Sequence, residues 1–181
     1  MALIECGTHA LVDAAFDAVA TASEHTLARG LLASLPQGML LLADRAFVGY
    51  HLWGLARATG AHLAWRITSN QVFAPLRVLA DGSFLSVMPT PAEAVRYGQA
   101  RAAGRPLTTP PVGHLVRIIT YTVTVHPTDA PPRTETFWLV TSLLDHKQAP
   151  ARRLAMIYHQ RWGATRSRTS LSELPDRRLD G

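Results

Sequence analysis

The chain has 181 residues, of which 48% are hydrophobic and 17% charged, a composition typical of a folded globular domain and not of a disordered chain. Its length predicts one domain. The longest apolar run, residues 39–43, is far shorter than the roughly 20 residues that a membrane-spanning helix needs, and Glu5 stands where a signal peptide would have basic residues. A single cysteine, Cys6, excludes an internal disulfide, so we expect a cytoplasmic protein without a membrane partner.

The charge is positive overall, with 18 basic and 13 acidic residues and a formal net charge of +5. Lys147 is the single lysine, and the guanidinium group of the remaining basic residues suits bidentate phosphate contacts. The basic excess is concentrated at the C-terminal end, in Arg152, Arg153, Arg161, Arg166, Arg168, Arg177 and Arg178. Such an end favours a polyanion such as nucleic acid, although a solvated basic surface explains the pattern equally well.

The first third of the chain predicts alternating strands and helices. Residues 2–6 form a short predicted strand, and a helix is expected after Ser23, its predicted N-cap. Residues 39–43 are continuously apolar, as in a strand buried on both faces, and a helix at 48–59 and a strand at 62–67 follow. The order predicts an α/β fold.

The middle of the chain predicts mainly β-structure. Asp81-Gly82 lies between apolar residues as in a hairpin turn, and residues 117–125 are rich in β-branched side chains. Residues 89–113 carry several prolines and glycines, so we expect a long, mobile loop there, with one helical turn near 92–97.

The last part predicts a strand at 137–144, a helix from Pro150 to about Trp162, and a tail beyond Gly163 without regular structure. These elements suggest four segments. They are a partial α/β core (1–67), a β-rich insertion with a long Pro/Gly loop (68–135), a return strand with the C-terminal core helix (136–162), and a divergent basic tail (163–181).

Asp44 is the first candidate for chemistry, because it follows the apolar run 39–43. A carboxylate at the end of a buried strand points into the crevice where α/β sheets bind ligands. Asp44 could equally cap the helix expected near Val48. No histidine pair has the spacing of a zinc-binding helix, and the chain has no Gly-rich phosphate loop.

Four short motifs together resemble the DDE transposases of bacterial insertion sequences. They are Leu-Leu-Ala-Asp-Arg-x-Phe at 41–47, Leu-x-Trp-Arg at 63–66, Asp-Gly-Ser at 81–83 and Tyr-His-x-Arg-Trp at 158–162. The resemblance covers roughly residues 2–162. It implies an RNase H-like mixed sheet flanked by helices, with a β-rich insertion, and DNA as the partner. It also implies cleavage and strand transfer at phosphodiesters by two Mg²⁺ ions held by three carboxylates.

The same resemblance implies roles for individual residues. Asp44 matches the family's second catalytic carboxylate and hence a metal ligand. Tyr158 and Arg161 match the family's Tyr-x-x-Arg-x-x-x-Glu helix, where they would contact DNA, and Arg45 belongs to the Asp-Arg-x-Phe motif with the same expected partner.

The chain departs from the family pattern in two places. The Glu expected four residues after Arg161 is Thr165, and the Lys expected seven residues later is Ser172. Glu173 lies about 12 Å farther along a continuing helix and cannot replace the missing Glu. The strand with the family's first Asp would precede residues 2–6.

These departures predict an inactive fragment, incomplete at its N-terminus, with residues 163–181 arising from a frameshift or an interrupted gene. In that case the strand edges at 2–6 and 39–43 would be left uncovered. The alternative is a non-catalytic, basic DNA-binding module that uses Arg152, Arg153 and Arg161.

Overall fold

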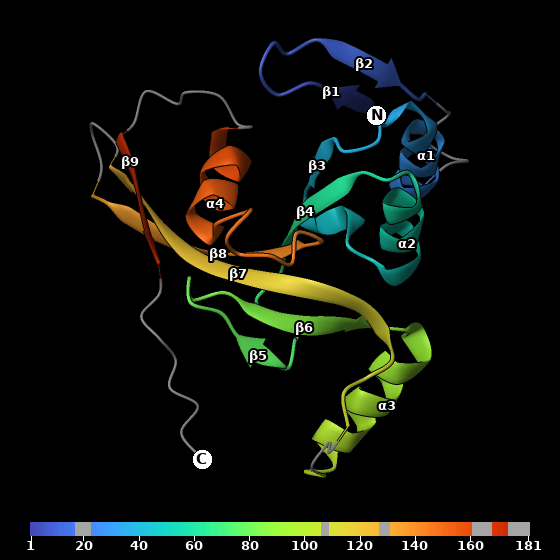
Figure 1. The fold of residues 1–181 in the computed structure, drawn as a ribbon, viewed down its shortest axis with the longest axis vertical. Coiled ribbons are helices and arrows are strands. Elements are labelled where there is room, and N and C mark those ends of the chain that lie inside the picture. Colours follow the sequence, from blue (N-terminus) through green and yellow to red (C-terminus); the bar gives the residue numbers. More distant parts are fainter. Residues whose placement is uncertain (17–22, 106–108, 127–130, 161–167, 174–181) are drawn as a thin grey trace.

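The structure is a computed structural model that describes residues 1–16, 23–105, 109–126, 131–160 and 168–173. Its centre is a seven-stranded mixed sheet (Figure 1). The strand order is β3 (Leu40–Ala43), β4 (His62–Ile67), β8 (Arg133–Thr141), β7 (Gly113–His126), β6 (Phe84–Pro89), β5 (Arg77–Val78), with β9 (Arg168–Glu173) paired to β7. Strands β3 and β4 are parallel, and the other pairs are antiparallel.

Strand β7 is long enough to pair with two strands along one edge. Its first part, Gly113–Ile118, pairs with β6, and its last part, Tyr121–His126, pairs with β9. Strand β8 pairs with the opposite edge. The strands of residues 68–135 therefore continue the same sheet that β3 and β4 begin, and the segment boundaries at 67 and 135 stay a prediction.

The helices cover both faces of the sheet (Figure 1). Helices α1 (Glu24–Leu31) and α2 (Tyr50–Ala58) form a hydrophobic core with one face of the sheet. In this core the rings of Trp53 and Trp65 meet edge to face, with 5.1 Å between their centroids. Helix α4 (Ala151–Gln160) packs on the other face with residues of β7 and β8. Helix α3 (Pro91–Ala102) projects from the end of the molecule opposite the β1–β2 hairpin (Ala2–Ile4 and Leu11–Ala14).

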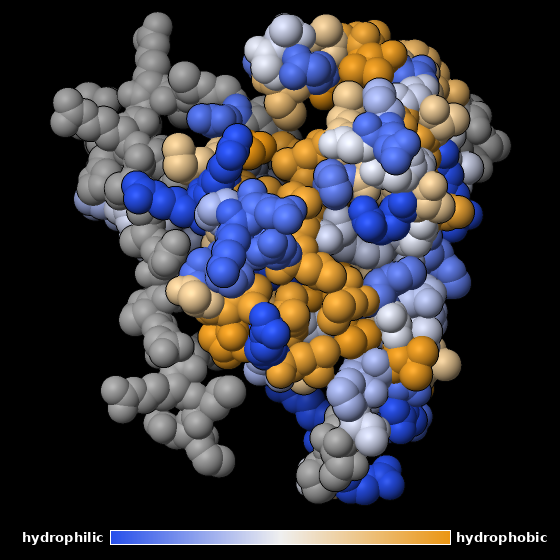
Figure 2. Space-filling view, in the orientation of Figure 1, coloured by the Kyte–Doolittle hydropathy of each residue, from blue (hydrophilic) through white to orange (hydrophobic). Residues whose placement is uncertain are grey.

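Part of the sheet surface is left open by these helices. On the face seen in Figure 2, hydrophobic side chains gather in the middle of the molecule, over the region where Figure 1 shows β6 and β7. Leu115 of β7 is 49% exposed and Val78 of β5 is 53% exposed.

Several sequence predictions are confirmed. The Ser23 hydroxyl caps α1 by accepting a hydrogen bond of 3.2 Å from the Thr26 N–H. The parallel β3–β4 pair and the hairpin turn at Asp81-Gly82 are present, and Gly82 has a φ of +78°. The α/β class is also correct, because the fold is a mixed sheet flanked by helices, compatible with an RNase H-like domain.

Other predictions are wrong. The expected loop at 89–113 contains α3, which Thr90 caps by accepting from the Glu93 N–H, and which begins with Pro91. Proline at the first helical position is a start signal, and the prediction counted it as a helix breaker. The expected structureless tail contains β9, since pairing with β7 supplies the order that its composition does not. The remainder of 163–181, and the predicted helix end at Trp162, lie outside the described residues.

Candidate functional site

Asp44 lies directly after β3, at the carboxyl end of the parallel pair. Its Oδ1 accepts a hydrogen bond of 2.7 Å from the Arg45 N–H, so it also caps the short 3₁₀ helix η2 (Arg45–Phe47). The capping alternative for Asp44 therefore holds in part, because the capped turn is η2, whereas the N-cap of α2 is Gly49. The cap uses Oδ1, which leaves the second carboxylate oxygen, Oδ2, as the atom that could bind a ligand.

Tyr158 brings α4 to the same end of β3. Its hydroxyl lies 3.4 Å from the carbonyl oxygen of Ala43, the residue before Asp44, and donates to it. The Tyr158 side chain is fully buried in the core between α4 and the sheet. Asp44 and Tyr158 are 114 positions apart in the sequence, yet Tyr158 contacts the residue that precedes Asp44, as the resemblance implies. Complete burial favours a role in fixing α4 against β3 over direct contact with DNA.

The basic candidates differ in their position. Arg45 is exposed beside Asp44, and Arg152 and Arg153 are exposed on the first turn of α4. Arg161 lies outside the described residues. Among the arginines that the sequence singled out for DNA contact, those that the structure describes, Arg45, Arg152 and Arg153, are all exposed.

A cavity of about 680 Å³ adjoins Asp44. Its wall is largely apolar and is built from the β1–β2 hairpin, α1 and β3, with Glu5, His9 and Asp44 as its polar members. Strand β3 is the last strand of the sheet on this side among the described residues, and all four of its residues line the cavity. Among the described residues, β3 has one neighbouring strand, whereas β1 in the segment 2–6 pairs with β2, so the expected open edges differ between the two segments.

Two carboxylates of this region are engaged in local structure. Glu5 accepts hydrogen bonds from the N–H of Gly7 at 2.8 Å and from the hydroxyl and N–H of Thr8, each at 2.5 Å. The Thr8 hydroxyl is the largest cause that lowers the pKa of Glu5 to about 2. Asp13 of β2 accepts a hydrogen bond from the Ser34 hydroxyl.

A metal centre therefore lacks donors in this region. Within the part of the chain that the structure describes, no three His, Cys, Asp or Glu side chains lie close enough to hold a metal ion together. Asp44 alone supplies too few anionic oxygens for two divalent cations. The described residues do not fit the two-ion centre that the resemblance implies.

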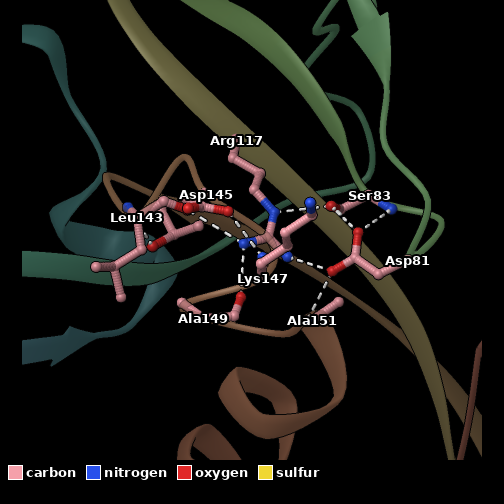
Figure 3. A network of polar contacts seen from close by, with 9 residues as sticks. Asp81, Ser83, Arg117, Leu143, Asp145, Lys147, Ala149 and Ala151 are labelled. Carbon is pink, nitrogen blue, oxygen red and sulfur yellow. Dashed lines mark hydrogen bonds and ion pairs between the residues drawn. The ribbon is translucent and has the colours of Figure 1, made fainter.

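A second polar network lies on the α4 side of the sheet and was not predicted (Figure 3). The fully buried guanidinium of Arg117 on β7 donates from Nε to Ser83 Oγ at 2.7 Å and from Nη2 to Asp81 Oδ2 at 2.5 Å. Its Nη1 donates to the carbonyl oxygens of Ala149 at 2.6 Å and Leu143 at 3.2 Å. Every nitrogen of this buried cation has an acceptor, as burial of a charge requires.

Asp81 completes the network at the start of α4. Its Oδ2 also accepts a hydrogen bond of 2.9 Å from the Ala151 N–H, the first residue of α4. Burial opposes ionisation of Asp81, but the hydrogen bonds from Ser83 and Ala151 and the charge of Arg117 outweigh burial and lower its pKa. The carboxylate therefore stays ionised at a helix N-terminus, where negative charge is stabilised.

The sequence did hold a signal for this network. Arg117 shares a strand face with Ile119 and Tyr121, both buried, so strand alternation places a lone cation inside the protein. A buried cation needs a carboxylate, and Asp81 stands in the turn that precedes the paired strand β6. The sequence predicts residues 81–83 only as a hairpin turn and as part of the family resemblance, and it assigns no role to Arg117.

The fold and site define a class: an α/β domain with a carboxylate after a parallel strand and a C-terminal helix that meets the end of that strand. A model of the transposase DDE domain matches residues 2–164. The chain belongs to this family, so its function is transposase-like at the level of the family, whose members act on DNA and generally depend on a metal.

The searches of curated proteins and of solved structures gave no match. Among the helices of the described residues, none combines the length and the apolar character needed to cross a bilayer.

Proposed function

We propose that this transposase-family chain binds DNA but does not by itself cleave or join it. The observation that supports inactivity is the donor set around Asp44. Phosphoryl transfer by two ions needs several carboxylate oxygens to hold both cations, and the described residues contain no group of three His, Cys, Asp or Glu side chains that could hold a metal ion. Mg²⁺ would find in Asp44 one ligand of the expected set.

DNA binding is supported by the arrangement of exposed charge. Arg152 and Arg153 project from the first turn of α4, and Arg45 lies next to Asp44. Arginine suits phosphate contacts because its planar guanidinium can donate two parallel hydrogen bonds. The net charge of +5 adds a long-range attraction to a polyanion. Arg161 and Tyr158 remain candidates from the resemblance, Tyr158 by positioning α4.

The cleavage half of the proposal is tested with supercoiled plasmid. We expect the purified chain to leave the plasmid intact with Mg²⁺ or Mn²⁺ over the concentration range in which it binds DNA. Nicking that requires the metal and disappears in Asp44→Ala would show that the chain assembles a working centre. Nicking that persists in Asp44→Ala would instead exclude Asp44 as a ligand of that centre.

The binding half is tested by the salt dependence of duplex binding. Because each neutralised phosphate contributes about 0.9 to the slope of log K against log salt, Arg152→Ala/Arg153→Ala should lower the slope by up to about 1.8. Arg29→Ala is the matched control, because Arg29 is an exposed arginine of α1, on the other side of the sheet. Absence of duplex binding at about 50 mM salt would contradict the proposal.

A further inference from the structure

A second large groove lies beside α3, away from the cavity at Asp44. It has a volume of about 950 Å³ and is enclosed by α3, residues 71–76, β6 and the start of α2. Its lining combines aromatic, apolar and basic side chains, with Tyr50, Phe73, Leu76, Tyr97, Arg101 and Arg105 among them. Leu76 is 44% exposed and its neighbour Val72 is 63% exposed, so the groove presents apolar surface to solvent.

The charged residues that line the groove are all basic within the described part of the chain. None of its described lining residues is acidic, and it holds Arg101 and Arg105. Both arginines are exposed, and neither side chain has an ion pair or hydrogen bond within the described ranges. Glu93, the acidic residue of α3, is engaged elsewhere, with Arg96 at 2.6 Å and the Val112 N–H at 3.3 Å.

The aromatic walls are held in place by neighbours. The Tyr50 ring stacks on His114 with 4.3 Å between ring centroids and an angle of 24° between the planes. The Tyr97 hydroxyl donates to the carbonyl oxygen of Thr109. An aromatic ring fixed in this way offers a flat surface at little further cost in conformational entropy, which is the property that stacking a nucleobase requires.

The groove begins close to Asp44 along the chain. Val48, Gly49 and Tyr50 line it, and Tyr50 is six residues after Asp44. At most about 3.6 Å per residue can separate the two Cα atoms, which limits their distance to roughly 22 Å. This span is about six base steps of B-form DNA at 3.4 Å each. One DNA strand can therefore reach from Asp44 into the groove.

We propose that this groove binds an unpaired stretch of DNA, with Arg101 and Arg105 on its phosphates and Tyr50 stacked against a base. The inference rests on the proposed DNA binding and names the form of DNA for this surface. Unpaired DNA is favoured over duplex because the bases of a duplex are stacked on each other, so that mainly its phosphates are accessible. Phosphates do not bind to apolar and aromatic walls, whereas unpaired bases can stack on them. A protein partner without acidic side chains would match the apolar walls but would leave both arginines without a complementary charge.

The test compares two DNA probes and two pairs of arginines. Fluorescence anisotropy is measured with a labelled oligo-dT of 20 nucleotides and with a duplex of 20 base pairs. We expect Arg101→Gln/Arg105→Gln to weaken oligo-dT binding about tenfold or more and to lower its salt slope by about 1.4, with a much smaller effect on the duplex. The matched pair Arg152→Gln/Arg153→Gln should show the opposite preference.

The stacking role of Tyr50 is tested by removal of the ring. Tyr50→Leu should weaken oligo-dT binding roughly fivefold to hundredfold, whereas Tyr50→Phe should retain the affinity. If Tyr50→Leu fails to fold, photocrosslinking of iodouridine-labelled oligo-dT to the unaltered chain replaces it, with crosslinks expected at Tyr50, Phe73 or Tyr97.

The outcomes separate the two proposals. Duplex binding that depends on Arg152 and Arg153, together with oligo-dT binding that is absent or insensitive to Arg101 and Arg105, would overturn the groove assignment and leave the proposed function intact. Crosslinks confined to other surfaces would overturn it in the same way. Absence of binding to either probe would overturn both.

Discussion

Asp81 and Arg117, which are 36 residues apart in the sequence, form an ion pair of 2.5 Å between Oδ2 and Nη2, and the same carboxylate oxygen accepts from the Ala151 N–H. One carboxylate therefore joins the β5–β6 turn, the long strand β7 and the first residue of α4. At its other end α4 meets Ala43 through Tyr158. The position of α4 relative to Asp44 is thus fixed at both ends of the helix.

Loss of the Arg117 guanidinium should strongly destabilise the fold. Arg117→Leu leaves the Asp81 carboxylate without its cation and leaves the carbonyl groups of Leu143 and Ala149 without a donor. Removing one partner of a buried pair costs about 3–5 kcal/mol, and because Asp81 is partly exposed we expect about 3 kcal/mol. The free energy of unfolding from urea denaturation measures the loss.

Arg96→Leu is the matched control for this substitution, because Arg96 pairs with Glu93 on the exposed side of α3. We expect almost no change in the free energy of unfolding, since exposed ion pairs contribute little. Equal effects of the two substitutions would mean that the Arg117 network does not hold the fold together.

The pKa of Asp81 predicts an acid-sensitive contribution to stability. Its folded pKa lies below the ordinary value of 3.8, so the folded state binds fewer protons than the unfolded state. The contribution is complete above about pH 4 and is lost as the pH falls through the folded pKa. Asp81→Asn should lower stability at neutral pH and flatten its dependence on pH below 4, measured by urea denaturation at several pH values. If Asp81→Asn left the dependence of stability on pH below 4 unchanged, Asp81 would be excluded as a cause of that dependence.

The sequence was informative where local chemistry decides the structure. The Ser23 cap, the strand before Asp44 and the turn at Gly82 follow from a capping hydroxyl, an apolar run and a residue that tolerates positive φ. The prediction that this strand is buried on both faces is wrong, because β3 is half-buried and stands at the end of the strand order among the described residues. The proximity of Tyr158 to Asp44 was predicted from the order of the family motifs, because no rule of local structure relates residues so far apart in the sequence.

Long-range contacts explain what the sequence did not reveal. Strand β9 is ordered by its partner β7, and its own segment has no apolar period. Arg117 has an environment set by the β5–β6 turn and the residues before α4. The groove beside α3 could not be predicted from the sequence because α3 itself was not predicted. The prolines of 89–113 indicated a loop, although a proline can begin a helix as well as end one.

Gly113 should not tolerate a side chain, because it lies where β7 begins beside the end of β6. A Cβ atom at this position would lie 2.0 Å from the carbonyl oxygen of Met88, and backbone atoms cannot move aside as a flexible side chain would. We expect Gly113→Ala to cost about 2 kcal/mol or more in the free energy of unfolding. Gly98→Ala is the control, because nothing lies within 4 Å of its Cβ position and alanine favours the helix α3. A neutral Gly113→Ala would contradict the close approach of β6 and β7.

Tyr158 should contribute to stability through its ring. Tyr158→Ala removes a fully buried side chain between α4 and the sheet, so we expect a loss of about 3–5 kcal/mol in the free energy of unfolding. Met156→Ala on the same helix is the control, because Met156 is 42% exposed and leaves no buried cavity. If Tyr158→Ala left stability unchanged and weakened DNA binding instead, the side chain would be a DNA contact and not a positioning residue.

Glu5 should titrate far below its ordinary pKa. The hydroxyl of Thr8 and the N–H groups of Thr8 and Gly7 stabilise the ionised carboxylate and hold its pKa at about 2, against an ordinary value of 4.5. Carbon-detected NMR titration of the Glu5 carboxyl measures this value directly. Thr8→Val should raise the pKa toward the ordinary value because it removes the hydroxyl, whereas Thr8→Ser should leave it low. The result bears on the site at Asp44, because both side chains line the same cavity. A Glu5 with an ordinary pKa would not be held by its own turn, and its carboxylate would then be available as a second metal ligand beside Asp44.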